Sequence, residues 1–161
     1  MTPNEEIKSY LVSKFFNGSS QTDQELIVVL ESFINEYKTQ KKIHQVPVGI
    51  FANKNLGILE STVKYLKENN NLTYHEIAVL LKRDDRTIWA TYHKAIRKEK
   101  NIFSTVENGQ TIDLNIISNR EQAPLQALIR HLKSQGLNFR QISQLLNRSY
   151  KTVWVTYNKK K

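Results

Sequence analysis

An internal repeat restricts the fold of this chain more than any other feature of its sequence. Residues 46–95 align with residues 112–160, first at an offset of 66 and then, after the loss of one residue, at an offset of 65. In the later part of the alignment, ten residues recur unchanged: Leu72, Ile77, Leu80, Leu81, Arg83, Thr87, Trp89, Thr91, Tyr92 and Lys94. So many identities in so short a stretch indicate a duplication of one structural unit. We call residues 46–98 the first repeat, 99–111 the linker and 112–161 the second repeat.

Each repeat is predicted to begin with a short strand, because apolar residues alternate over Val46–Ile50 and over Ile112–Ile116. A lone strand would leave its backbone donors and acceptors unpaired. We therefore expect the two strands to pair with each other, which would make the repeats a pseudo-twofold dimer within one chain. The alternative is pairing between two chains in a homodimer.

Three helices are predicted after each strand. The first covers residues 57–68 or 123–134, and the second begins with a capping box, in which two side chains satisfy backbone N–H groups at the helix start. The third helix follows a four-residue turn and begins after a short polar residue that makes a good N-cap. The capping boxes are Thr73 with Glu76 and Asn138 with Gln141, and the last N-caps are Asp84 and Ser149. Such a plan is typical of a helix-turn-helix unit.

The residues around the predicted turn resemble the helix-turn-helix of sigma-factor region 4. In the first repeat they are Ile77-Ala78, Leu80-Leu81, Arg83-Asp84 and Thr87-Ile88. The resemblance implies that Ala78 lies where the two helices cross and that the β-branched Ile88 fills the core. Residues 46–161 as a whole are similar to small prokaryotic proteins with tandem units of this type. Two departures stand out: Ser143 replaces the alanine in the second repeat, and Lys82 or Asn147 occupies the turn where glycine is usual.

The charge of the chain is concentrated in the repeats. The chain has a formal net charge of +9 and a pI of about 9.7. Residues 1–45 contain five lysines and six acidic residues, whereas residues 46–161 contain nineteen basic and nine acidic residues. The basic excess favours a polyanionic partner for the repeats.

Residues 1–45 are predicted to form a pair of helices. The two helix starts are marked by Thr2, Pro3 and Glu5 and by Thr22 and Glu25. The second helix carries an apolar stripe of Leu26, Val29, Leu30, Phe33, Ile34 and Tyr37. This stripe either packs against the rest of the chain or forms a homodimer. The expected fold is therefore mainly α, with an N-terminal helical pair followed by two strand-plus-three-helix units.

The outer face of each last helix is the candidate DNA-binding site. In the first repeat it consists of Arg86, Ala90, His93 and Arg97, flanked by Thr87 and Lys94, and in the second of Lys151, Val155 and Asn158, flanked by Thr152 and Lys159. Such a face suits the major groove, where Arg or Lys pairs with guanine, Asn with adenine and a small apolar side chain with the thymine methyl group. The alternative is a set of solvated polar positions.

The second repeat is expected to bind more tightly than the first. Residues 137–161 include Arg140 and Arg148 and contain no acidic residue. Ser149 and Tyr150 can donate to a phosphate at the start of the last helix, whereas the first repeat has Asp84 and Asp85 there. Carboxylates at a helix N-terminus compete with a phosphate for the same N–H groups.

The repeated tryptophans, Trp89 and Trp154, have two interpretations. We favour packing against the first helix or a neighbouring unit, and base stacking is the alternative, which matters mainly for a single-stranded partner.

No enzymatic chemistry is expected. The chain has no cysteine, its four histidines are scattered and its five glycines form no phosphate-binding loop. We therefore expect no catalytic residue, no metal and no cofactor. No run of residues reaches the ~18 apolar residues of a membrane span, and the N-terminus lacks the pattern of a signal peptide. The expected location is the cytoplasm, associated with the nucleoid.

The sequence therefore predicts a double-stranded DNA-binding protein that acts as a transcriptional regulator. One alternative is a protein that binds structured RNA or the ribosome, because the phosphates of RNA would attract the same basic residues. A second alternative is a protein-interaction module, because helix-turn-helix units also bind proteins.

Overall fold

The computed structural model describes residues 28, 32–34, 44–104 and 109–159. The chain divides into two compact units, Met1–Thr39 and Gln40–Lys161. In the first unit, Val28 and residues 32–34 are helical. The remainder of the predicted N-terminal helical pair, together with its packing or dimerisation role, lies outside the described residues.

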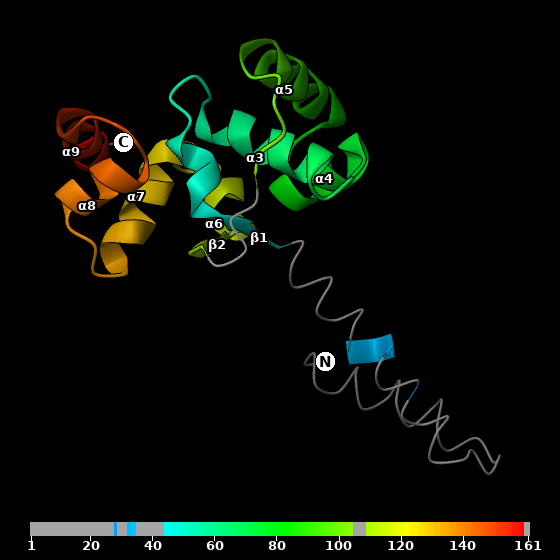
Figure 1. The fold of residues 1–161 in the computed structure, drawn as a ribbon, viewed down its shortest axis with the longest axis horizontal. Coiled ribbons are helices and arrows are strands. Elements are labelled where there is room, and N and C mark those ends of the chain that lie inside the picture. The colour runs from blue at the N-terminus through cyan, green and yellow to red at the C-terminus, as the bar shows by residue number, and fades with distance from the viewer. Residues whose placement is uncertain (1–27, 29–31, 35–43, 105–108, 160–161) are drawn as a thin grey trace. The chain divides into compact units, whose positions relative to one another are not determined.

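The second unit is mainly helical, as the sequence predicts. Its first repeat contains β1 (Gln45–Pro47), the 3-10 helix η1 (Val48–Ala52), α3 (Ile58–Glu68), α4 (Tyr74–Leu81) and α5 (Asp85–Lys98). Its second repeat contains β2 (Thr111–Asp113), α6 (Leu114–Ser118), α7 (Pro124–Ser134), α8 (Phe139–Leu145) and α9 (Tyr150–Asn158). The described residues thus hold eight helices and one two-stranded antiparallel sheet (Figure 1).

The two strands pair with each other within the chain, and the register of the pair is symmetric. Val46 lies opposite Ile112, its counterpart at an offset of 66, and residues on either side pair reciprocally. Beyond the strands, Val48 N–H donates to the Gln110 carbonyl at 2.8 Å, and Leu114 N–H donates to the His44 carbonyl at the same distance. These two bonds also exchange under the offset of 66. A pseudo-twofold axis therefore passes through the pair of Val46 and Ile112.

The predicted strands are too long, and their second halves are helical. Val48–Ala52 forms η1 and Leu114–Ser118 forms α6. The alternation that suggested a strand ends at Phe51 and Ile117, which are both fully buried. Buried residues at Leu114, Ile117 and Ser118 follow the spacing of a helix face. The chain turns into a helix here because a helical turn places these side chains in the core.

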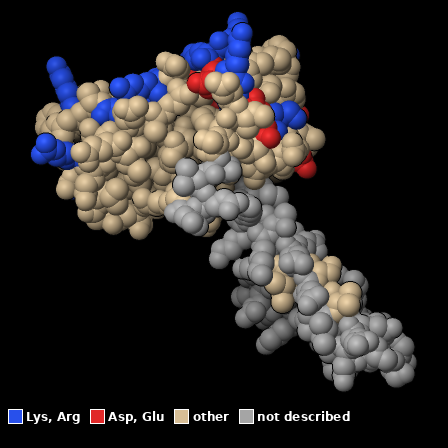
Figure 2. All heavy atoms as spheres, viewed as in Figure 1, with Lys and Arg blue, Asp and Glu red and all other residues tan. Residues whose placement is uncertain are grey.

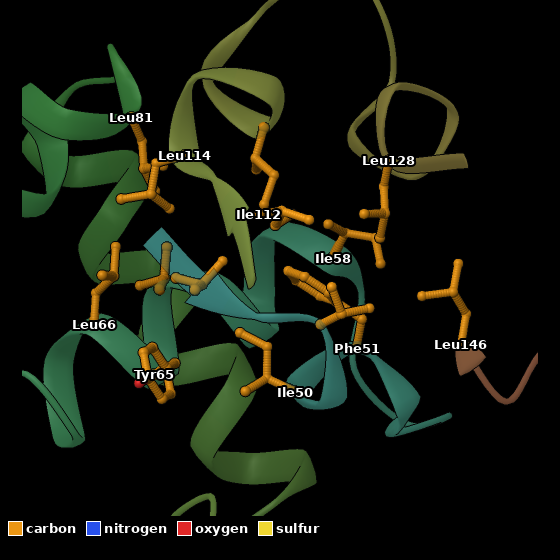
Figure 3. Close-up of a cluster of buried hydrophobic side chains, with 14 of the residues drawn as sticks. Ile50, Phe51, Ile58, Tyr65, Leu66, Leu81, Ile112, Leu114, Leu128 and Leu146 are labelled. Atoms are coloured by element: carbon orange, nitrogen blue, oxygen red, sulfur yellow. The ribbon is translucent and has the colours of Figure 1, made fainter. Parts of the chain in front are cut away.

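Each short helix completes the core of the other repeat. Helix α6 packs against α7 of its own repeat and against α4 of the first repeat, while η1 packs against α3 and against α8 of the second repeat. Figure 3 shows Leu114 beside Leu81 and Phe51 facing Leu146, four side chains that are almost fully buried. The two repeats therefore share one hydrophobic core.

The helix-turn-helix turns take the conformation that usually requires glycine. Lys82 has φ 52° and Asn147 has φ 50°, both in the left-handed region. The other departure from the resemblance is also accommodated, because the Ser143 hydroxyl donates to the Arg148 carbonyl at 2.8 Å within the turn. The predicted caps are confirmed: Thr73 and Asn138 form capping boxes, and Asp84 and Ser149 cap the last helices.

Candidate nucleic-acid interface

The last helices, α5 and α9, lie at opposite ends of the second unit (Figure 1). Each is held by a buried face, with Ile88 and Ala95 fully buried on α5 and Val153 fully buried on α9. The predicted outer residues are exposed, except that Thr87 and His93 are half-buried. Both helices therefore turn the face that the sequence singles out away from the core.

On α9 the outer face combines basic, amide and apolar side chains. Lys151 and Lys159 are exposed and form no ion pair with a described residue. Val155 is 50% exposed beside them. The Asn158 amide donates to the Trp154 carbonyl at 2.9 Å and must turn away from it to reach a base edge. This face therefore offers positive charge that no described acid neutralises.

On α5 much of the positive charge is paired with one acid of α3. Lys98 lies 2.8 Å from the Glu60 carboxylate, and Lys94 lies 3.4 Å from it. Burial raises the pKa of Glu60, but hydrogen bonds from Lys98 and the Gly57 N–H lower it more, and the net pKa lies below the ordinary value. Arg86 remains exposed, while Arg97 donates to the His93 carbonyl at 3.1 Å.

The N-termini of the two helices also differ in charge. Asp84 accepts hydrogen bonds from the Thr87 hydroxyl at 2.6 Å and the Thr87 N–H at 2.8 Å, and these bonds lower the pKa of Asp84. Asp85 lies 3.2 Å from the His75 ring. At α9 the same cap is the neutral Ser149, whose hydroxyl accepts from the Thr152 N–H at 3.1 Å. The Thr152 hydroxyl lies 2.8 Å from the Ser149 hydroxyl. The hydroxyls of Thr87 and Thr152 are therefore part of the caps in both repeats.

The charge distribution is visible on the surface. Figure 2 shows Lys and Arg side chains along the upper edge of the second unit, while Asp and Glu on that face appear only over the end that holds α3, α4 and α5. The charged side chains visible at the end formed by α7, α8 and α9 are all basic. On this face the acidic side chains are therefore confined to the first repeat.

Arg148, one of the basic residues expected to contact DNA, also forms hydrogen bonds within the fold. Its guanidinium donates to three carbonyls of the loop after η1: Leu56 at 2.7 Å, Lys54 at 2.9 Å and Asn53 at 3.2 Å. These bonds join the turn of the second repeat to the first repeat. Arg140, on α8, and Tyr150, the first residue of α9, are exposed.

Neither tryptophan is a core residue, and each keeps about half of its side chain covered by the fold. Trp89 is 52% exposed and Trp154 is 49% exposed, at equivalent places on α5 and α9. The Trp89 ring contacts the His93 ring in a tilted arrangement, with the ring centroids 4.1 Å apart and the planes inclined at 48°. Each indole therefore flanks the outer face of its helix.

The sequence analysis missed a buried ionic cluster between α3 and α5. Lys64 is fully buried and forms an ion pair with Glu68, which also accepts from the Tyr92 hydroxyl at 3.2 Å. A spacing of four residues places Lys64 and Glu68 on one helix face, but that spacing gives no sign of burial.

Comparison with known proteins does not assign a role to these residues. No protein-family model, no curated protein and no solved structure matches the chain. Within the described ranges, no three His, Asp or Glu side chains are grouped so that they could hold a metal ion. No helix in the described part of the chain has the length and apolar character needed to cross a membrane.

Proposed function

We propose that this protein binds double-stranded DNA and regulates transcription, with α9 as its principal reading helix and α5 as a weaker second one. The observation that carries the proposal is the outer face of α9, where Lys151, Val155 and Asn158 are all exposed and Lys151 forms no ion pair with a described acid. A basic patch beside a small apolar and an amide side chain offers both phosphate attraction and base-edge contacts.

The pseudo-twofold arrangement supports a target with two half-sites. Helices α5 and α9 are the third helices of two repeats related by the axis through Val46 and Ile112. Symmetric helix-turn-helix dimers read two half-sites about one turn of DNA (~34 Å) apart. Because the two helices differ in charge, the target is expected to be an imperfect palindrome with its better half under α9.

The proposal is tested by selecting bound duplexes from a random pool and measuring their affinity by fluorescence anisotropy over a range of salt concentrations. Lys151→Glu is expected to abolish binding, whereas Arg86→Glu reduces it several-fold. Asn158→Ala should cost about 1–3 kcal/mol on the selected site and little on random DNA. Lys159→Ala should weaken both and reduce the salt slope by about one.

Three results would contradict the proposal in distinguishable ways. Equal losses on selected and random DNA for Asn158→Ala would remove base reading by α9. Displacement of the duplex by structured RNA at lower concentration would favour the RNA-binding alternative. If Arg86→Glu has no effect on DNA while Trp89→Ala abolishes capture of a protein partner, the first repeat is an interaction module and only one groove is read.

A further inference from the structure

A groove of about 500 Å³ opens between the two repeats. It is lined by Gly57, Ile58, Leu59 and Glu60 at the start of α3, by Arg83, by Thr91 and Lys94 on α5, and by Ala123, Pro124 and Leu125 at the start of α7. Residues from both repeats thus form its walls. Its volume lies within the range of small-molecule sites, about 300–1,000 Å³.

One cation in this groove has no partner. The Nε atom of Arg83 is buried and unsatisfied, while the two terminal guanidinium nitrogens are not among the buried atoms and form no hydrogen bond with a described residue. A buried donor without an acceptor costs free energy, and such groups in a native fold call for an explanation.

The pseudo-twofold counterpart of Arg83 shows what is missing. At the equivalent position, Arg148 donates to three carbonyls of the loop after η1, at distances from 2.7 to 3.2 Å. The matching loop after α6 makes no such bond to Arg83 in the described structure. The same side chain therefore ties the repeats together on one side of the axis and faces an open groove on the other.

The other charged side chains that line the groove are already paired, and Arg83 is not. Glu60 is the acid of the groove, and its carboxylate already accepts from Lys98 at 2.8 Å and from the Gly57 N–H at 2.9 Å, with Lys94 at 3.4 Å. The other walls include the apolar side chains of Ile58, Leu59, Pro124 and Leu125.

We propose that the groove binds a small organic anion whose carboxylate pairs with the Arg83 guanidinium and whose apolar body lies against α3 and α7. An arginine presents a planar fork of donors that fits a carboxylate in two parallel hydrogen bonds. A ligand in this place contacts α5 of the first repeat and α7 of the second, and so bridges the two repeats where no arginine bridge exists. The proposal does not depend on DNA binding.

The test uses calorimetric titration of the full chain with naphthoate and with naphthalenemethanol, which share an apolar body and differ in charge. Naphthoate is expected to bind about ten- to hundredfold more tightly, the effect of one charge-assisted interaction. Arg83→Gln should remove that preference. The matched control is Lys82→Gln, which deletes a positive charge from the adjacent exposed residue and should leave the preference intact.

A second variant approaches the groove from an exposed position. Ala123 is exposed at the start of α7 and lines the groove, so Ala123→Trp should fill the groove without disturbing the core and should block naphthoate. Equal affinity for the two compounds, no binding of either, or equal behaviour of Arg83→Gln and Lys82→Gln would each overturn the proposal.

Discussion

Replacing Arg148 should destabilise the fold, whereas the same change at Arg83 should not. The two arginines are equivalents in the repeat, but Arg148 donates to three carbonyls and Arg83 to none in the described structure. The bonds to Asn53 and Leu56 are partly buried, and the bond to Lys54 is exposed. A hydrogen bond from a charged donor contributes about 1.5 kcal/mol at the low end, and an exposed one contributes little.

The expected loss for Arg148→Ala is therefore about 2–3 kcal/mol in the free energy of unfolding. For a unit of this size, that loss corresponds to a fall of about 10 °C in melting temperature. Circular dichroism during heating and urea titration measures both quantities, with Arg83→Ala as the matched control. The control should lose no stability, because the Arg83 side chain forms no hydrogen bond with a described residue and its buried Nε is unsatisfied. If both variants lose the same stability, the bridge from Arg148 does not hold the repeats together and the reasoning is wrong.

Three further changes have expected outcomes. Lys82→Gly should raise the free energy of unfolding by about 1 kcal/mol, because glycine adopts a left-handed conformation without strain, and Asn147→Gly should raise it less; urea titration measures both. Asp84 has a lowered pKa, so its stabilisation is present above the ordinary value of 3.8 and is lost as the pH falls below it. Hydrogen exchange should therefore show α5 opening before α9 in acid, and Asp84→Asn should remove the difference if the reasoning holds. Glu68→Gln should cost about 3 kcal/mol because it leaves Lys64 buried without its carboxylate, while Lys64→Met should cost far less; similar losses in thermal melts would contradict this.

Local signals in the sequence were sufficient to predict most of the helices. The capping residues Thr73, Asp84 and Asn138 mark helix starts because their side chains bond backbone groups only three residues away. The pairing of the two strands joins residues about 66 positions apart, but it followed from the repeat and from the need of unpaired backbone groups for partners. The caps could be predicted because they join residues only three positions apart.

The parts that could not be predicted depend on residues far apart in the chain. The role of Arg148 rests on carbonyls more than 90 residues away, and a carbonyl acceptor leaves no mark in the sequence because every residue has one. The alternation of apolar residues at Val48–Ile50 fits a strand as well as a helix. The burial of Phe51 alongside Ile50 distinguishes the two, and it is seen only in the folded structure. Exposure of Trp89 and Trp154 was likewise undetermined, since a duplicated aromatic residue looks the same on either side of a helix.

The exchange of η1 and α6 between the repeats has a consequence for how the molecule responds to its own concentration. A homodimer that exchanges such elements falls apart on dilution, and its occupancy of a two-half target then depends on the square of the monomer concentration. Here the linker joins the two repeats covalently. Helices α5 and α9 therefore stay together in a single molecule at any dilution. Occupancy of a target that needs both helices then rises with the first power of concentration, without a threshold. Since no second copy has to match, mutations can alter one helix while leaving the other unchanged.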